Sequence, residues 1–228
     1  MAEGSSQRET RILDAAASLI AHYGYDKTTV EDIARSASVS KGAVYLHFRS
    51  KEQLFEALLM RESDVLIERY FELLDSDPQG VTIFNIYRYG LEVTDESPLV
   101  KAMFTNDRRV LGDYLRHVRD TPAYKQISSF GIEAVRQFQQ AGLIRADIDA
   151  EAVSYLLNAI RYGLLAMDEY TPGGEAPSIK QLGAALAQML DRGLAPREGE
   201  GDQAAARATL QRLLDAKEQF IAQRRNQG

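Results

Sequence analysis

Apolar residues recur at steps of three and four along most of the chain, a spacing that places them on one face of an α-helix. The first run consists of Ile12, Ala15, Ala16, Leu19, Ile20 and Tyr23. Gly24 follows this run, as a glycine commonly follows the last turn of a helix. We find neither the alternation typical of strands nor an internal repeat, so the sequence predicts an all-α protein.

Capping residues and turns divide the chain into the expected helices. We expect helices at about residues 6–23, 29–36, 40–47, 51–74, 81–94, from 98 onward, 122–140, 150–170, 178–192 and 204–224. Thr29 with Asp32 resembles a capping box, and Ser40 can cap the following helix through its hydroxyl oxygen. Residues 196–202 are rich in Glu and Gly and are expected to form an exposed linker.

The composition excludes several classes of protein. The chain has no cysteine, which rules out disulfides, thiolate catalysis and cysteine-ligated zinc. The 228 residues are 45% hydrophobic and 26% charged, as in ordinary globular proteins. No apolar run approaches the roughly 20 residues that cross a bilayer, and the polar start is unlike a signal peptide. We therefore expect a cytoplasmic protein that does not bind membranes.

The charge is unevenly distributed along the chain. The whole chain carries −6, with 27 Lys and Arg against 33 Asp and Glu. Residues 1–51 hold 7 cationic and 6 anionic side chains, or +1, which leaves 20 against 27, or −7, for the remainder. Such a chain would bind DNA through a few positioned cations rather than through its overall field.

The segment from Thr28 to Lys51 has the pattern of a helix-turn-helix, two short helices joined by a tight turn. Ala34 suits a point where two helices cross closely. Four apolar side chains can share a small core: Ile33, Val39, Val44 and Phe48. The helix after Ser40 would then be the one that enters the major groove of DNA.

The residues left outside on that helix suit a DNA groove. Gly42 and Ala43 allow its backbone to approach closely, and Lys41 can reach a base edge or a phosphate. Four further side chains can donate to phosphates: Thr29, Tyr45, His47 and Lys51. Plainer roles remain open for them, since Thr29 caps its helix in any case, Tyr45 could be a core aromatic and Lys51 an ordinary solvated lysine. A metal role for His47 has no support, because the other histidines lie far away in the sequence.

The segment closely resembles the TetR family of bacterial transcriptional regulators. Residues 39–54 carry the motif Val-Ser-Lys-Gly-x-x-Tyr-x-His-Phe-x-Ser-Lys-Glu-x-Leu, and the resemblance covers about residues 8–60. It implies a three-helix DNA-binding head at 1–50 and a helical ligand-binding and dimerisation body at 51–228, with dimers formed through the last two helices. By residue match it implies DNA contacts from Thr29, Ser40, Lys41, Gly42, Ala43, Tyr45, His47 and Lys51. The chain departs from the family at Ser38, where a glycine with positive φ is usual.

In the family, the helices of the body enclose a small molecule. The aromatic candidates for such a site are Phe84, Tyr87, Phe104, Tyr114, Phe130 and Tyr162, although each could be plain core. Asn158 and Arg161 are polar among apolar neighbours, so they need partners if buried. Either could orient a ligand, line the dimer seam or face water.

The resemblance implies a ligand-responsive repressor that binds a palindromic operator as a homodimer and is released by a small-molecule inducer. A helical protein-interaction module without DNA binding and a helical enzyme are the alternatives. Against the enzyme, the sequence has no nucleophile–base pairing, metal-ligand cluster or cofactor-binding loop. We expect no cofactor and no metal. The sequence leaves open the effector, the operator, the sign of regulation and whether helix 204–224 joins the dimer interface.

Overall fold

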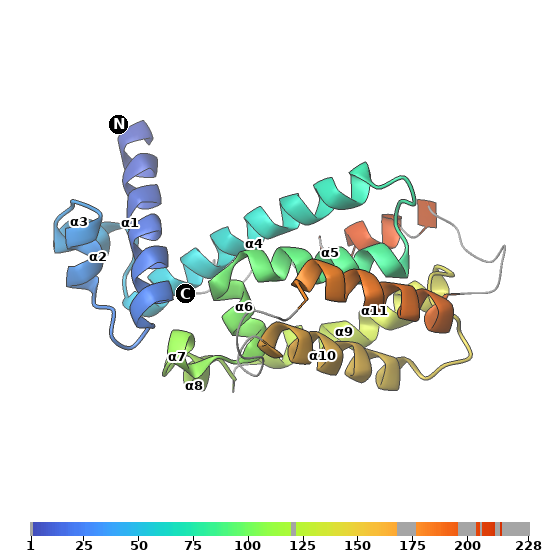
Figure 1. Cartoon of the computed structure of the whole chain (residues 1–228). Helices are drawn as coiled ribbons and strands as arrows, with labels where there is room; N and C mark the ends of the chain where they lie inside the picture. The colour runs from blue at the N-terminus through green and yellow to red at the C-terminus, as the bar shows by residue number, and fades with distance from the viewer. Residues whose placement is uncertain are drawn as a thin grey trace. The chain divides into compact units, whose positions relative to one another are not determined.

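The computed structural model describes residues 2–119, 122–167, 177–195, 204–205, 207–212 and 215, with side chains given outside 2–3 and 117–130. All regular structure in these ranges is helical (Figure 1), which confirms the all-α class. The helices are α1 (Ala2–Tyr23), α2 (Val30–Ser36), α3 (Lys41–His47), α4 (Lys51–Ser76), α5 (Ile83–Glu96), α6 (Pro98–Thr105), α7 (Arg108–Leu111), α8 (Tyr114–Arg119), α9 (Pro122–Gln140), α10 (Ala150–Ala166) and α11 (Ile179–Leu194).

The helix bounds follow the sequence closely, except after Pro98. There the chain forms three short helices, α6 to α8, because Asn106 ends α6 in the left-handed conformation and Asp107 caps α7. Gly112, with φ of 49°, then ends α7. The expected linker at 196–202 and most of the expected helix 204–224 lie outside the described residues, although 207–212 are helical.

The chain divides into two compact units. The first unit comprises residues 1–69 and 94–120, and the second comprises residues 70–93 and 121–228. The boundaries between the two units fall inside α4 and α5. The boundary expected after residue 50 separates a DNA-binding head from a ligand-binding body by function, and it stays a prediction. Because α4 begins in the first unit, its first turns share the core of α1 to α3.

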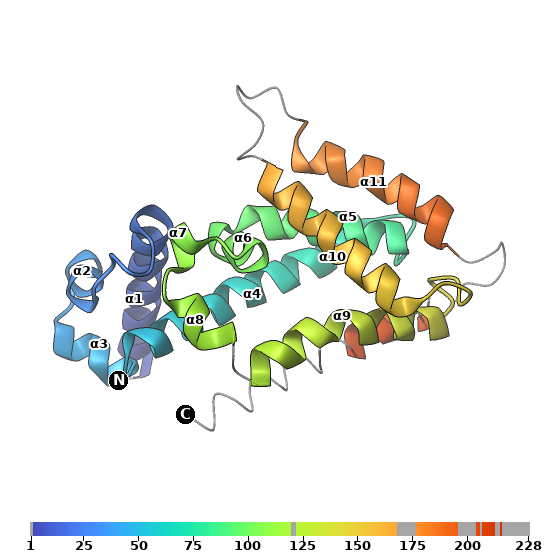
Figure 2. The same ribbon diagram turned by 90° about the horizontal axis from the view of Figure 1, so that it is seen from below.

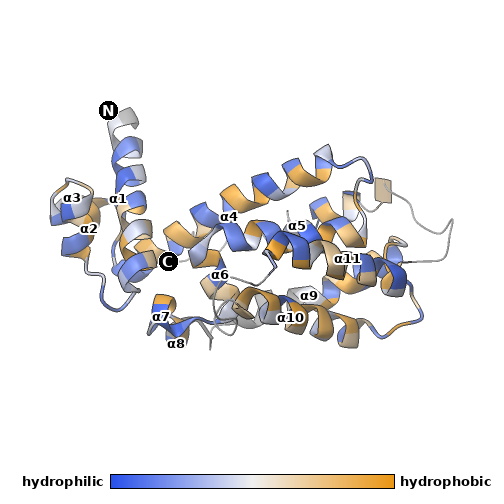
Figure 3. Ribbon diagram, in the orientation of Figure 1, coloured by the Kyte–Doolittle hydropathy of each residue, from blue (hydrophilic) through white to orange (hydrophobic). Residues whose placement is uncertain are grey.

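Each unit has its own apolar core. In the first unit, fully buried side chains come from all of its major helices, among them Ile12, Ile20, Ile33, Val44, Phe55, Leu99 and Leu111. In the second unit the core includes Leu74, Ile83, Tyr89, Val135, Ile144 and Val153. Figure 3 shows hydrophilic and hydrophobic stretches alternating along α4, as expected of a helix with one buried face.

The turn between α2 and α3 has the backbone conformation that the sequence predicted. Ser38 has a φ of 55°, a value that usually requires glycine. The turn is closed by two hydrogen bonds, from Ser38 N to Arg35 O at 3.2 Å and from Val39 N to Ala34 O at 2.9 Å. The core therefore holds Ser38 in a left-handed conformation that costs on the order of 1–2 kcal/mol.

Glycine at this position should stabilise the first unit. We expect Ser38→Gly to raise the free energy of unfolding by about 0.5–1 kcal/mol, because relief of the left-handed strain exceeds the added entropy of the unfolded chain. Ser36→Gly is the matched control, since Ser36 is helical and glycine there should lower stability by about 0.5 kcal/mol. Urea unfolding of both variants measures the difference, and stability changes of the same sign would contradict the assignment.

Candidate nucleic-acid interface

α2 and α3 are two short helices with capped N-termini. Thr29 and Asp32 form the predicted capping box, with Asp32 N donating to Thr29 Oγ1 at 3.1 Å and Thr29 N donating to Asp32 Oδ2 at 3.2 Å. Ser40 Oγ accepts a hydrogen bond from Ala43 N at 3.1 Å, so it caps α3 as expected. Figures 1 and 2 both place α2 and α3 on the same side of α1.

α3 has one anchored face and one exposed face. Val44 and Phe48 are buried in the core of the first unit. Across the helix, Leu46 is 83% exposed and Tyr45 is 45% exposed, so Tyr45 is not a core aromatic. α3 is thus held by its buried side and presents a row of side chains to solvent.

Gly42 leaves the exposed face of α3 open near its start. A Cβ built on Gly42 would meet only Ser40 Oγ, at 3.9 Å, within a 4 Å radius. Nothing in the described fold requires a glycine at this position. The backbone of α3 is therefore open to solvent at this point.

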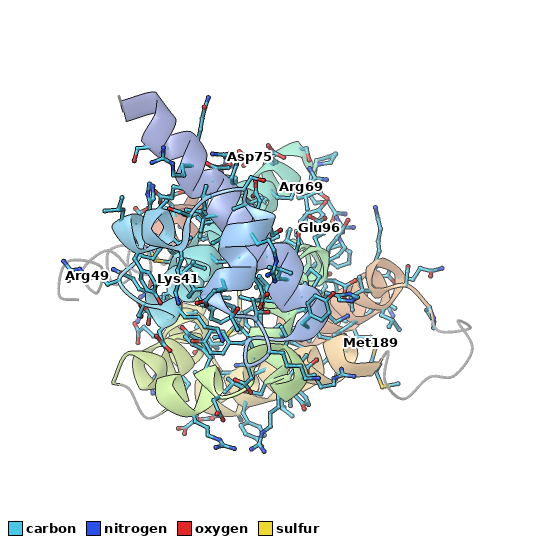
Figure 4. The ribbon with its side chains drawn as sticks, turned by 90° about the vertical axis from the view of Figure 1, so that its left-hand side faces the viewer. Lys41, Arg49, Arg69, Asp75, Glu96 and Met189 are labelled. Carbon is cyan, nitrogen blue, oxygen red and sulfur yellow. The ribbon has the colours of Figure 1, made fainter. Side chains whose placement is uncertain are left out.

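Lys41 is not free in solution. Its ammonium donates to the Glu31 carboxylate on α2 and lies 6.0 Å from the centroid of the Tyr45 ring. The hydrogen bond from Lys41 lowers the pKa of the Glu31 carboxyl, and the same bond raises the pKa of Lys41. Figure 4 shows Lys41 and Arg49 on the side of the chain that carries α2 and α3, and Arg49 is exposed.

Two further predicted DNA contacts, His47 and Lys51, also have partners within the fold. The His47 side chain is only 10% exposed, and its Nδ1 lies 3.8 Å from Glu9 Oε2 on α1. Lys51 Nζ donates to the backbone oxygen of Tyr25 at 2.5 Å and lies 3.9 Å from the centroid of the Tyr25 ring. Lys51 is therefore not an ordinary solvated lysine, and burial lowers its pKa.

Tyr25 is the centre of a junction that the sequence did not reveal. Its backbone N–H donates to Val110 O at 2.8 Å, and its hydroxyl donates to Glu52 Oε1 at 3.1 Å. Its ring centroid lies 5.0 Å from that of Phe55 and 5.6 Å from that of Tyr114. Burial and the carboxylate of Glu52 raise the pKa of the Tyr25 hydroxyl. The loop before α2 is thus fixed to both α4 and α7.

Two glycines allow a close approach at this junction. Gly24 has a φ of 83°, and a Cβ there would overlap the carbonyl oxygen of Arg109. A Cβ on Gly112 would overlap the carboxylate of Asp26, which accepts a hydrogen bond from Asp113 N at 2.9 Å. The close approach leaves no room for larger residues.

The aromatic and polar candidates for an effector site are divided between the two units. Phe104 and Tyr114 belong to the first unit, where Tyr114 is a buried core residue and Phe104 is 39% exposed. In the second unit, the Arg88 guanidinium lies 4.9 Å from the centroid of the Phe84 ring, and Tyr162 is 49% exposed. The side chain of Phe130 lies outside the described part of the chain.

Three of these candidates do come together in the second unit. Tyr87 Oη donates to Leu157 O at 2.6 Å, and burial raises the pKa of Tyr87 to about 12. Arg161 Nη2 donates to Asn158 Oδ1 at 2.6 Å, and burial lowers the pKa of Arg161. Tyr87 on α5 and Arg161 on α10 thus lie near each other, and Asn158 lies beside Arg161 with its own side chain exposed.

The described residues offer neither a cluster of metal ligands nor a membrane span. Among them, no three His, Asp or Glu side chains gather where they could hold a metal ion. No helix in the same ranges is long and apolar enough to cross a membrane.

The geometry of α2 and α3 defines the class of the protein, a helix-turn-helix DNA-binding protein. Residues 12–58 match the sequence model of the bacterial regulatory proteins of the tetR family. Over these residues the chain is similar to the TetR family of bacterial transcriptional regulators.

One relative and two solved structures extend the similarity beyond this segment, the structures in fold alone. The chain is 29% identical over 172 residues, 75% of its length and 83% of the relative's, to the HTH-type transcriptional repressor KstR2 of Rhodococcus jostii. It shares its fold with NalD of Pseudomonas aeruginosa, the secondary repressor of the MexAB-OprM efflux pump, at a TM-score of 0.59 and 24% identity over 86% of this chain and 99% of that one. It also shares its fold with FadR from Bacillus subtilis, which was solved in complex with stearoyl-CoA. The TM-score is 0.58 at 19% identity, over 79% of this chain and 96% of FadR.

Three residues on or near α2 and α3 were not among the candidates named from the sequence: Glu31, Tyr25 and Arg49. Glu31 and Tyr25 carry no local signal, because their partners lie 10 residues away or more. Arg49 stands inside the motif as an exposed cation just before Ser50, and counting the cations around α3 could have found it.

Alanine at position 42 should separate folding from DNA binding. We expect Gly42→Ala to raise the free energy of unfolding by about 0.5–1 kcal/mol, because alanine favours a helix and its Cβ meets open space. The same methyl group should weaken DNA binding about tenfold, or about 1.4 kcal/mol, by holding the backbone away from the bases. Thermal melts and fluorescence anisotropy measure the two effects. Gly90→Ala on α5 is the control and should leave DNA affinity unchanged. Unchanged DNA affinity in Gly42→Ala would contradict a close approach of the α3 backbone to the bases.

The ammonium of Lys51 should stabilise the first unit even without DNA. Lys51→Met keeps the apolar stem and removes the charged hydrogen bond to Tyr25, which should cost about 1–2 kcal/mol. A domain of this size should then melt lower by roughly 2–8 °C. Lys27→Met, an exposed lysine in the same loop, is the matched control in the same calorimetric scans. Equal melting temperatures for the two variants would show that the Tyr25 contact contributes nothing to folding.

Proposed function

We propose that this protein is a ligand-responsive transcriptional repressor that binds a palindromic operator as a homodimer and releases it when a small molecule binds the body. The observation that carries the proposal is α3, fixed by the buried Val44 and Phe48 and exposed along its opposite face. Such a short rod, presented twice by a dimer, matches half-sites one turn apart on the same face of DNA.

The proposed DNA contacts fall into two groups. Lys41, Gly42 and Ala43 lie on the first turn of α3, where they would meet base edges. The contacts with the sugar–phosphate backbone of DNA are assigned to Thr29, Ser40, Tyr45, His47 and Lys51. For His47 and Lys51, the partners Glu9 and Tyr25 position the side chain beforehand, so that binding orders less of it.

The dimer is proposed to form through α10 and α11. Large apolar side chains are exposed on both helices: Tyr155 at 77%, Leu156 at 58%, Tyr162 at 49% and Met189 at 69%. Together they would leave much apolar area in water if the protein were a monomer. A second copy of the same surface would bury them about a twofold axis.

The effector is proposed to bind the second unit near Tyr87, Asn158 and Arg161. This polar group among apolar helices suits a molecule that is apolar over most of its length and carries hydrogen-bond acceptors at one end. FadR of Bacillus subtilis binds a molecule of that kind, stearoyl-CoA. Fatty acyl-CoA thioesters are therefore the first effectors to test.

Regulation would follow from differential binding. An effector that prefers one conformation of the body shifts the population of DNA-binding dimers, with a coupling of typically 1–3 kcal/mol. α4 runs from the first unit into the second and is the proposed lever between head 1–50 and body 51–228. In this account the protein acts in the cytoplasm by binding rather than by catalysis.

Selection of duplexes from a random pool tests the proposed function directly. We expect enrichment of a palindrome that the protein binds with a Kd of about 10⁻⁸ M or tighter at physiological salt. Stearoyl-CoA, added to the preformed complex, should lower the affinity at least fivefold. If no sequence is enriched at low salt, the repressor assignment fails; if no acyl-CoA weakens binding, only the effector class is wrong.

A charge placed on the exposed apolar surface of α10 should produce monomers. We expect Tyr155→Glu to raise the dimer dissociation constant by at least a hundredfold, because an unpaired carboxylate would be buried at the interface. Operator affinity should fall with it. Val65→Glu, an exposed apolar residue of α4, is the control and should remain dimeric. Sedimentation velocity measures the mass, and a Tyr155→Glu dimer as stable as wild type would place the interface elsewhere.

A further inference from the structure

An acidic residue lies beside the proposed DNA-reading cation. Glu31 is in the first turn of α2 and Lys41 is the first residue of α3. The Lys41 ammonium donates to the Glu31 carboxylate, and both side chains are about half exposed. The pair therefore joins the N-terminal turns of the two helices on the surface proposed to face DNA.

The stability of the fold gives little reason for a glutamate at position 31. Exposed ion pairs contribute little to stability. The N-terminus of α2 is already served by Asp32, which completes the capping box and supplies a negative charge at the positive end of the helix dipole. A carboxylate at this place would in addition repel the phosphates of an approaching duplex.

The contact restricts what Lys41 can do. A lysine side chain has a flexible four-carbon stem, and an unrestrained ammonium can donate a hydrogen bond to any nearby phosphate. Here the ammonium is held between the Glu31 carboxylate and the face of the Tyr45 ring. A phosphate must compete with Glu31 for it, whereas a base edge at the first turn of α3 can be met in the held position.

We propose that Glu31 is a positioning residue that sets the DNA specificity of the protein through Lys41. It keeps Lys41 directed at the base edges and withholds it from phosphates, so that non-specific binding is weaker than the cations of the head would otherwise give. The inference rests on the proposed function, since it assumes that α3 enters the major groove.

Glu31→Gln tests the inference in the full-length protein. Anisotropy titrations use a duplex selected by wild type and a scrambled duplex of equal composition, each over a salt series. We expect the variant to bind the scrambled duplex about three- to tenfold more tightly, with a salt slope steeper by about 1, the mark of one added phosphate contact. The ratio of the two affinities should fall. Glu68→Gln is the control, an exposed carboxylate about 25 Å along α4 from Lys51.

A double-mutant cycle separates positioning from simple charge repulsion. If Glu31 acts through Lys41, then Glu31→Gln should leave the affinity ratio unchanged in a Lys41→Gln background. An equal fall of the ratio in both backgrounds would overturn the inference, and so would an unchanged ratio in the single variant. A wild-type protein that prefers no duplex would instead overturn the proposed function.

Discussion

α3 exists because two of its side chains are buried. A helix of seven residues is too short to persist alone in water, since nucleation costs more than its few hydrogen bonds return. Val44 and Phe48 supply the missing stabilisation, each by about 1.5–3 kcal/mol when fully buried. The same anchors fix the rotation of the helix about its axis. Every outward residue of α3 is therefore placed by two inward ones.

The anchors in turn depend on the rest of the first unit. α1 and the first turns of α4 complete the core around Val44 and Phe48, and the Tyr25 junction fixes the loop that leads into α2. Close contacts hold that loop against α7, at Gly24 with the backbone of Arg109 and at Gly112 with the carboxylate of Asp26. Contacts of this kind deform little, so α1 to α3 and α7 should move as one body when the protein changes conformation.

Local features of the fold could be predicted from the sequence, because their causes lie within a few residues. The capping box at Thr29 and the cap at Ser40 follow from neighbouring residues, whereas the positive φ of Ser38 was implied by the family resemblance. The break into α6, α7 and α8 was missed, although Asn106, Asp107 and Gly112 are residue types that commonly end or cap helices. Helical periodicity correctly separated Lys41 and Gly42 from Val44, but it also placed His47 outside, and the side chain of His47 is only 10% exposed.

Non-local features of the candidate site could not be predicted. The partners of Lys41, His47 and Lys51 come from α2, α1 and the loop before α2. No spacing in the sequence encodes those pairs, since they arise only when helices pack. The same limit applies to the effector candidates, where Tyr114 and Tyr87 look alike in sequence but belong to different units. Periodicity identifies which side of a helix is buried, but not what it is buried against.

The central claim is that α3 enters the major groove of DNA twice, once from each protomer. Dimethyl sulfate footprinting on the selected duplex tests it most directly, because the reagent methylates guanine N7 in the major groove and adenine N3 in the minor groove. The account predicts protection of guanines in two major-groove segments about 34–36 Å apart on the same face of the duplex. Protection of a single segment, or of minor-groove adenines alone, would contradict it.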